Sequence, residues 1–329
     1  MKRVYSGIRA TGRLHLGNYF GAVKGMLTLQ DKYDCIFSVV DLHTITVPFD
    51  PKTLKQSVRD IIIDYLAAGL DPAKCRLEIQ SKVVQHTELA YLLSTIYPAS
   101  RLEDLPTYKE KKAQYPKYIN MGLLYYPVLM AADVLLYKGE LVPVGIDQEP
   151  HLEVMREIAR KFNSMFGQTF PEPQRFKTVG EYVPSLAGAG KMSKSIEGSY
   201  INLTDDLETI KKRLAAAPTD SGTVGGDPTS PRLRGTGVAN LFTLLKLFKL
   251  DKECAKFEQD YKNKKIRYSD LKDVLARAIF KELQPFQKRR EEFVGNPELV
   301  DNIIEEGRIK CARMAEETMK EVRSKMGLI

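Results

Sequence analysis

The sequence has few cysteines, and their spacing excludes the common metal and redox motifs. The four cysteines, Cys35, Cys75, Cys254 and Cys311, lie far apart in the chain. No close pair is present of the kind that chelates zinc or forms a Cys-x-x-Cys redox site. Free, mostly buried thiols in a reducing compartment are therefore expected. Tryptophan is absent altogether, and the sequence offers no physical reason for that.

The sequence also lacks a hydrophobic run long enough to cross a membrane. Its most apolar stretch, residues 122–137, carries Pro127 and Asp133 and is shorter than the roughly 20 residues that a membrane span needs. The first seven residues lead into glycine-containing loop sequence and not into the apolar segment of a secretory signal. These absences predict a buried helix over 122–137 and a soluble protein of the cytoplasm.

What is present fits a globular protein of about two domains. The 329 residues are 43% hydrophobic and 28% charged, which leaves ample apolar material for a core. The formal net charge is +8. A mild basic excess permits a nucleic-acid partner, whose phosphates need lysine and arginine, but it does not demonstrate one.

The first half alternates strand and helix patterns. Strands are predicted by short apolar or β-branched runs at residues 3–7, 35–40, 76–80 and 141–144. Between them, helical spacing is seen at residues 17–29, 54–68 and 151–166. This alternation predicts an α/β fold, a Rossmann-like parallel sheet with helices on both faces.

The second half changes character. Residues 187–190 have a flexible hinge composition. After a strand-like run at 200–203, Thr204 and Asp205 can cap a helix that ends near residue 217. Residues 218–237 read as a long loop, and only helical patterns follow. We therefore predict a catalytic domain over 1–203, including a loop at 188–198, and an all-helical domain over 204–329. Its C-terminal helix can pack back on the first domain.

Two segments carry the chemistry. The first, residues 6–18, follows the first strand and precedes the first helix. Its glycines, Gly7, Gly12 and Gly17, allow close backbone approach, and the helix start offers N–H groups to a phosphate. The alternative, a merely glycine-rich turn, has even odds on glycine content alone.

The second segment is residues 191–195, Lys-Met-Ser-Lys-Ser, between Gly188, Gly190 and Gly198. Two lysines three apart on a hinged loop suit a mobile clamp for a polyphosphate. Taken alone, such a pentapeptide is usually just a solvated basic loop.

Together the two segments resemble the signatures of class I aminoacyl-tRNA synthetases. Residues 15–18, His-Leu-Gly-Asn, look like the HIGH motif of that class with its last histidine replaced, and residues 191–195 match its KMSKS motif. The segments 39–47, 106–111, 126–133 and 142–148 narrow the resemblance to bacterial-type tryptophanyl-tRNA synthetases, over essentially the whole chain. The chain departs from the family at Arg9, Ala10 and Ile146, and the last change leaves only a backbone role there.

The resemblance implies a two-step reaction. The tryptophan carboxylate attacks the α-phosphate of ATP and releases pyrophosphate; the terminal ribose hydroxyl of the tRNA then takes the aminoacyl group. Lys191, Lys194 and Arg9 are the implied catalytic residues, and Mg²⁺ accompanies ATP without a protein metal site. The implied ATP-binding residues are Arg9, Ala10, Thr11, Gly17, Asn18, Gly145, Ile146, Asp147, Val183, Lys191, Met192, Ser193, Lys194 and Ser195.

For the amino acid, Tyr126, Met130 and Asp133 share one helical face. Core packing is the plain explanation for the first two, but an unpaired buried carboxylate is expensive. By resemblance, Asp133 accepts the indole N–H, and Tyr126 and Gln148 hold the α-amino group. The remaining implied substrate-binding residues wall the ring slot or lie beside it: Tyr5, Gly7, His43, Val142 and Val144. His86 and His151 fall on helices, where a structural role is expected.

The resemblance also implies partners. It predicts tRNA(Trp) and a homodimer. The basic, aromatic-interleaved tracts at 108–118 and 261–268 are candidate tRNA contacts, with a solvated helix face as the equal alternative. Some relatives hold an iron–sulfur cluster with clustered cysteines; Cys254 and Cys311 cannot supply one, so neither that cluster nor zinc is expected.

Two other functions stay open at this point. A tyrosyl-tRNA synthetase shares the fold, and Tyr5 with Asp133 would suit a phenol, although the segments 41–47 and 142–148 favour tryptophan. A non-catalytic paralogue that senses an amino acid or binds RNA would have no need of the intact 191–195 loop.

Overall fold

The computed structural model describes the chain from Met1 to Ile329 except for residues 146–147, 178–181, 195, 223–225, 229–232 and 234. These residues form two units. The first comprises residues 1–12, 26–178 and 293–329, and the second comprises residues 13–25 and 179–292. The predicted functional boundary at residue 203 stays a prediction, because compactness alone does not say which unit binds which substrate.

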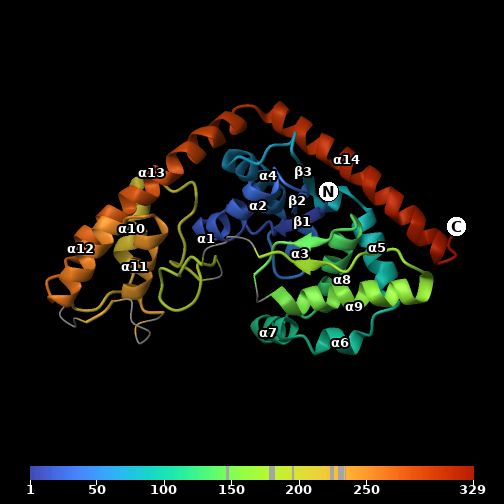
Figure 1. The fold of residues 1–329 in the computed structure, drawn as a ribbon, viewed down its shortest axis with the longest axis horizontal. Helices are drawn as coiled ribbons and strands as arrows, with labels where there is room; N and C mark the ends of the chain where they lie inside the picture. The colour runs from blue at the N-terminus through green and yellow to red at the C-terminus, as the bar shows by residue number, and fades with distance from the viewer. Residues whose placement is uncertain (146–147, 178–181, 195, 223–225, 229–232, 234) are drawn as a thin grey trace. The chain divides into compact units, whose positions relative to one another are not determined.

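A five-stranded sheet is the centre of the first unit (Figure 1). Its strands run parallel in the order β3-β2-β1-β4-β5. They are β1 (Arg3–Ile8), β2 (Asp34–Val39), β3 (Cys75–Ile79), β4 (Leu141–Val142) and β5 (Gln174–Arg175). The first four lie where their apolar runs predict them. β5 has no such run, so no sequence pattern predicts it.

Helices cover both faces of this sheet, which confirms the predicted α/β class (Figure 1). The helical elements of this unit, besides most of α2 (Lys24–Leu29), are α3 (Asp41–Thr44), α4 (Pro51–Ala68), the 3₁₀ turn η2 (Gln80–Lys82), α5 (Gln85–Ser94), α6 (Ala99–Glu103), α7 (Pro106–Gln114), α8 (Met121–Leu135), α9 (Glu149–Phe166) and α14 (Pro297–Lys325). Local chemistry sets the ends of α4: the Asp50 side chain accepts from Lys52 N–H, and Gly69 ends the helix at a φ of +110°.

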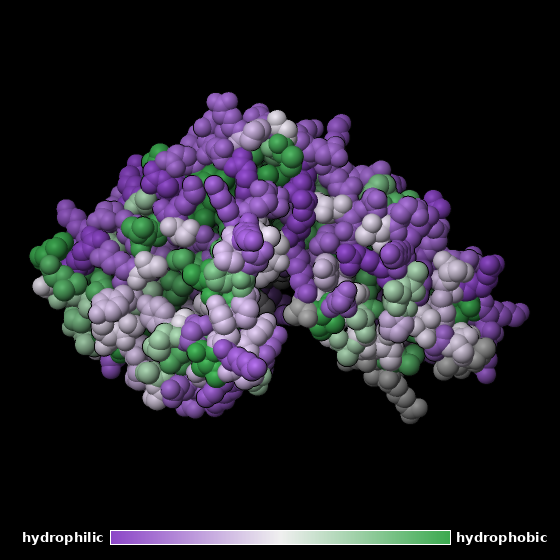
Figure 2. All heavy atoms as spheres, turned by 180° about the vertical axis from the view of Figure 1, so that it is seen from behind, coloured by the Kyte–Doolittle hydropathy of each residue, from purple (hydrophilic) through white to green (hydrophobic). Residues whose placement is uncertain are grey.

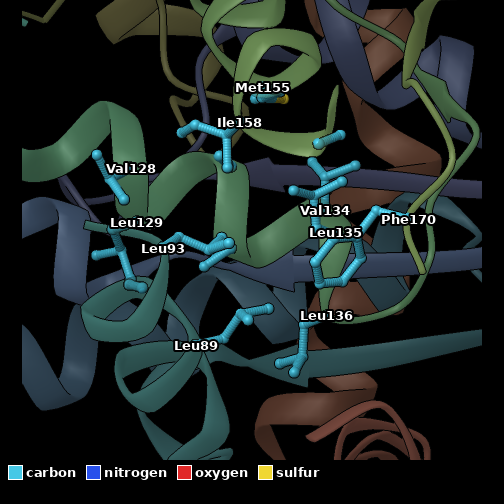
Figure 3. Packing of buried hydrophobic residues seen from close by; sticks show 14 of the residues in the cluster. Leu89, Leu93, Val128, Leu129, Val134, Leu135, Leu136, Met155, Ile158 and Phe170 are labelled. Carbon is cyan, nitrogen blue, oxygen red and sulfur yellow. The ribbon is translucent and has the colours of Figure 1, made fainter. Parts of the chain in front are cut away.

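The most apolar helix, α8, is buried as its composition predicts. Asn120 caps it by accepting a hydrogen bond from Leu123 N–H at 3.0 Å. Its inner face packs with α5 and α9 in the core of the first unit (Figure 3). The core residues labelled there include Leu89, Leu93, Val128, Leu129, Val134, Leu135, Leu136, Met155, Ile158 and Phe170. α8 thereby carries Asp133 into an apolar interior.

The C-terminal helix α14 packs against β3 in the same unit. A side chain at Gly307 would place its Cβ 1.9 Å from the carbonyl oxygen of Leu77. Only glycine allows this approach, so the helix lies directly on the strand backbone.

The second unit is helical apart from its loops. It holds α1 (Leu16–Asn18), the π-helical turn η1 (Tyr19–Val23), the start of α2 (Lys24–Leu29), α10 (Leu207–Ala216), α11 (Gly237–Leu247), α12 (Asp251–Lys262) and most of α13 (Tyr268–Val294). The strand expected at 200–203 is not one: only Asn202 pairs there, in an isolated bridge with His15. The cap of α10 is Asp206, which accepts from Thr209 N–H, and not Thr204 or Asp205. Asp205 instead accepts from Asn202 N–H.

Hydrophilic side chains predominate on the face shown in Figure 2, with smaller hydrophobic patches between them. Among the described residues, no helix is both long and apolar enough to cross a membrane.

Candidate functional site

A cavity lies at the carboxyl ends of the central strands of the first unit. β1 has β2 on one side and β4 on the other, and ligands of open parallel sheets bind where the strand order reverses in this way. The cavity has a volume of about 410 Å³, within the range of small-molecule sites. Its walls come from the end of β1, the residues after β2, helices α7 and α8, the end of β4 and the start of α9.

The cavity brings together all the residues predicted to bind the amino acid. Segments from residue 5 to residue 151 meet here. Which part of a substrate each residue contacts stays a prediction. The nine predicted residues that line the cavity are Tyr5, Gly7, His43, Tyr126, Met130, Asp133, Val142, Val144 and Gln148.

Asp133 is the most buried charged group of the cavity, with 1% of its surface exposed. Its Oδ1 accepts from Gln80 Nε2 at 2.7 Å and lies 2.7 Å from His86 Nδ1, and its Oδ2 lies 2.8 Å from His43 Nε2. Burial by itself raises the pKa of Asp133, but the charges and hydrogen bonds of His43 and His86 outweigh burial and hold that pKa well below its usual range. The carboxylate is therefore an ionised acceptor at the cavity wall.

His86, on α5, is fully buried between two carboxylates. Its Nε2 lies 2.5 Å from Glu78 Oε1, opposite the contact of Nδ1 with Asp133. Burial lowers the pKa of His86, but the charges of Glu78 and Asp133 overcome this and raise the pKa to about 10. An imidazolium that donates from both nitrogens satisfies both acidic neighbours. His86 does not line the cavity itself, but its Nδ1 contacts Asp133, which does.

The other walls near Asp133 are apolar or aromatic. The ring of Tyr5 stacks on Tyr137 with 5.8 Å between ring centroids and 16° between planes. The hydroxyl of Tyr5 is buried, and burial, followed by the charges of Asp133 and Glu78, raises its pKa well above the usual value. Met130, Val142 and Val144 complete a slot that suits a flat aromatic ring.

The opposite end of the cavity is polar. Tyr126 Oη donates to Thr107 Oγ1 at 2.9 Å and lies 2.8 Å from His151 Nε2. Sequence patterns assign no role to Thr107 and only a structural one to His151, yet both line the cavity. Thr107 lies in the segment 106–111 that resembles the family, which was its available signal; His151 lies beyond the segment 142–148 and had none.

Two cations also line this end. Arg9 follows β1, and Lys111 projects from α7. Burial and the charge of Arg9 together lower the pKa of Lys111, as expected for neighbouring cations. With Glu110 as the acidic residue of this rim, the excess positive charge suits an anionic group. Sequence reasoning named Arg9 and missed Lys111.

The neighbours of Arg9 in the predicted ATP-binding segment are held by the backbone. Ala10 N–H donates to Thr44 Oγ1 at 3.0 Å, and Thr11 N–H donates to the Arg9 carbonyl at 2.8 Å. Gly145, after β4, accepts from Gln148 N–H at 3.1 Å. Ile146 and Asp147, predicted with it, lie outside the described residues, as does Ser195.

In the second unit the HIGH-like segment forms the first helical turn. Asn18 Oδ1 accepts from His15 N–H at 3.2 Å, which closes a capping box around α1. Gly17 lies against His15 and Met192, leaving no room for a side chain. Burial, with the charge of Lys194 second, lowers the pKa of His15 to about 4, so this histidine is neutral near pH 7.

The loop with Lys191 and Lys194 lies in the same unit and is anchored at its base. Met192 N–H donates to the carbonyl of the buried Val183 at 2.9 Å, and Ser193 N–H donates to Ser199 Oγ at 3.2 Å. Asn240 on α11, which the sequence did not single out, donates to the carbonyls of Ser185 and Gly188. Gly188, Gly190 and Gly198 all adopt left-handed φ angles, so the loop needs its glycines where the sequence has them.

Among the described residues there is no group of three or more histidines, cysteines or acids that could hold a metal ion. The four cysteines are buried free thiols.

Known proteins with similar sequences indicate one family for this chain. Residues 1–284 match the model of the family "tRNA synthetases class I (W and Y)". The tryptophan–tRNA ligase of Caldanaerobacter subterraneus subsp. tengcongensis is 42% identical to this chain, over 100% of this chain and 99% of the relative. The tryptophan–tRNA ligase of Porphyromonas gingivalis is 40% identical to this chain, over 99% of both proteins. A crystal structure of tryptophanyl-tRNA synthetase from Campylobacter jejuni, complexed with ADP and tryptophan, has a TM-score of 0.85 at 32% identity over 99% of both chains.

The buried charges of this site predict a pH dependence of folding. The pKa of His86 rises from 6.5 to about 10, so its stabilising contribution is complete below about pH 6.5 and is lost as the pH rises through 10. The lowered pKa of Asp133 has its effect at acidic pH. The contribution of Asp133 to folding stability is present above about pH 4 and is lost as the pH falls further. We expect urea unfolding of wild type and His86→Gln to differ most near pH 6 and to converge toward pH 10. A difference that is constant over this range would contradict the assignment.

Proposed function

The chain belongs to the bacterial-type tryptophanyl-tRNA synthetases, within the class I family for tryptophan and tyrosine, and from this we propose that it attaches L-tryptophan to tRNA(Trp) with ATP. The tryptophan carboxylate attacks the α-phosphorus of ATP, and pyrophosphate leaves with the electrons of the broken bond. A terminal ribose hydroxyl of the tRNA then attacks the carbonyl carbon of the adenylate, and AMP leaves. The observation that carries the proposal is the apolar slot that ends on an ionised Asp133.

The cavity accounts for recognition of the amino acid from end to end. The indole ring lies in the slot of Tyr5, Met130, Val142 and Val144, and its N–H donates to Asp133. The ammonium and carboxylate groups then reach the polar end, where Tyr126 and Gln148 hold the ammonium and the cations of the rim attract the carboxylate. Burial of so large a ring supplies affinity at about 25 cal/mol per Å², and the single carboxylate supplies direction.

The ATP-binding roles rest on the family resemblance and on local geometry. Residues 9–11 border the phosphates, Gly17 and Asn18 bind ATP at the start of α1, Gly145–Asp147 contact the nucleoside and Val183 borders the adenine. Lys191 and Lys194 bind the pyrophosphate as charge develops on it, which is the kind of contact that lowers the barrier of a phosphoryl-type transfer. Mg²⁺ enters with ATP, because a substrate-bridging ion needs no cage of protein carboxylates. The charging of tRNA implies the cytoplasm as the compartment.

Tyrosine is the competitor that this site must reject. Its hydroxyl could meet Asp133 and Tyr5, but its ring fills the slot less and loses contact with Met130. A site built around a buried acceptor also penalises a ligand that leaves this acceptor poorly paired. These features favour tryptophan over the tyrosine alternative, and an intact loop at 191–195 favours an enzyme over a sensor.

We expect ATP–pyrophosphate exchange, run with each of the twenty amino acids, to proceed with tryptophan and to reject tyrosine by at least about a hundredfold in kcat/KM. Transfer of labelled tryptophan to tRNA(Trp) should follow. Exchange that is faster with tyrosine would move the chain to the tyrosine branch of the family, and exchange with no amino acid would favour the sensor.

Lys194→Ala should lower kcat far more than it changes the KM for tryptophan, because the lysine acts on charge that appears only in the transition state. The expected loss is about 2–4 kcal/mol of transition-state stabilisation, by comparison with removal of one oxyanion donor. Steady-state exchange measures it. Lys212→Ala, an exposed lysine of α10 in the same unit, is the control and should behave as wild type. An unchanged kcat in Lys194→Ala would remove the clamp role.

The homodimer is supported by exposed apolar side chains at and near α5 and α8, two helices that pack together. Val84 just before α5, Tyr91 on α5 and Met121 at the start of α8 are 68%, 67% and 74% exposed, and exposed large apolar side chains favour association. We expect Tyr91→Glu with Met121→Glu to convert a species of twice 37.2 kDa into a monomer in sedimentation equilibrium. Met165→Glu, at another half-exposed methionine on α9, should leave the dimer intact. A wild-type monomer would contradict the proposal.

A further inference from the structure

A chain of buried polar groups extends from the cavity into the core of the first unit. Tyr137 Oη donates to Glu78 Oε1 at 2.8 Å, the same oxygen lies 2.5 Å from His86 Nε2, and His86 Nδ1 lies 2.7 Å from Asp133 Oδ1. Each of these four residues is at most 1% exposed. Of these four residues, Asp133 is the one that lines the cavity.

The protonation of His86 decides which groups donate hydrogen bonds in this row of buried polar side chains. Two carboxylates face the two ring nitrogens of His86, and a neutral imidazole would turn a lone pair toward one of them. The imidazolium donates to both. One cation thus balances part of the charge of two buried acids, which would otherwise be costly to desolvate.

This arrangement fixes which part of Asp133 faces a substrate. Oδ1 is held by two contacts, from Gln80 Nε2 and His86 Nδ1, whereas Oδ2 has one, with His43 Nε2. A carboxylate offers about four acceptor positions. Contacts from the described residues occupy three of these positions, two on Oδ1 and one on Oδ2. The remaining position is on Oδ2, so that oxygen can accept one further N–H from the cavity.

We propose that His86 is a positioning residue for tryptophan: held by Glu78 and Tyr137 on one side, it orients the Asp133 carboxylate so that Oδ2 accepts the indole N–H. The inference rests on the proposed function and adds to it a residue that does not touch the substrate. His86 sets specificity through Asp133, and the relay Tyr137–Glu78–His86 keeps that acceptor in place while the site is empty.

The simplest competing account is that His86 only joins β3, α5 and α8. Hydrogen bonds that only join these elements affect folding, and their loss changes kcat/KM for every amino-acid substrate by the same factor. A positioning role affects only ligands that carry the ring N–H. The two accounts therefore separate on the ratio of kcat/KM for tryptophan to kcat/KM for an analogue of the same shape without that N–H.

The test uses 3-(1-benzothiophen-3-yl)alanine, in which sulfur replaces the indole N–H, in pyrophosphate exchange beside tryptophan. His86→Asn and His86→Gln are compared, because the Asn amide nitrogen falls near Nδ1 and can still donate to Asp133, whereas the Gln amide nitrogen falls near Nε2 and reaches Glu78 instead. We expect His86→Gln to lower the tryptophan-to-analogue ratio about tenfold or more, through a higher KM for tryptophan. His86→Asn should keep the ratio within about threefold of wild type.

The analogue also serves as the folding control, and its kcat/KM should stay within about threefold of wild type in both variants. If His86→Gln does not fold, the same ratio is measured in Glu78→Gln with His86→Gln, which removes the carboxylate left without its cation. A ratio equal to wild type in the folded variant, a parallel loss for both amino acids, or equal ratios in the Asn and Gln variants would each overturn the positioning role. Absence of tryptophan-dependent exchange in wild type would instead overturn the proposed function, so the two failures are distinct.

Discussion

The burial of one carboxylate is the constraint on which the site depends. Asp133 lies on the most apolar helix of the chain, where an ionised group without partners would cost several kcal/mol. The fold meets this cost with donors from three other elements: His43 on α3, Gln80 on η2 and His86 on α5. These donors must stay where they are for α8 to pack at all. Under the proposed function, stability and recognition of the substrate therefore rest on the same hydrogen bonds.

The cavity is divided by charge along its length. One end is an apolar slot that stops at a single oriented acceptor, and the other carries Arg9, Lys111 and the hydrogen-bonded set around Tyr126. An amino acid with a large ring that bears an N–H complements this division, since its ring and its charged groups lie at opposite ends. Phosphoryl-type transfer needs such positioning more than it needs a covalent partner in the protein.

The sequence predicted those strands and helices that are marked by apolar runs, capping residues or a terminal glycine. The strands β1 to β3 have apolar runs because both faces of a parallel sheet are buried, and α4 has a cap and a terminal glycine. Errors arose where local signals were weak or equivalent. β5 has no apolar pattern, and Asp205 and Asp206 are equally good caps by composition. The choice between them depends on Asn202, whose backbone N–H takes Asp205 as its partner.

The sequence by itself determined the fold class, the family and a set of residues that prove to line one cavity, because two spaced motifs and an acid in an apolar helix are visible without coordinates. Only the tertiary structure decided how that acid is used. His86 and Glu78 lie far from Asp133 in the sequence and on different elements, so no helical or strand period relates them to it. Their role follows from the parallel order of β1, β2 and β3 and from the packing of α5 on α8, which bring the carboxyl end of β3 beneath the cavity. Residue type identified the candidates, and non-local packing gave each its partner.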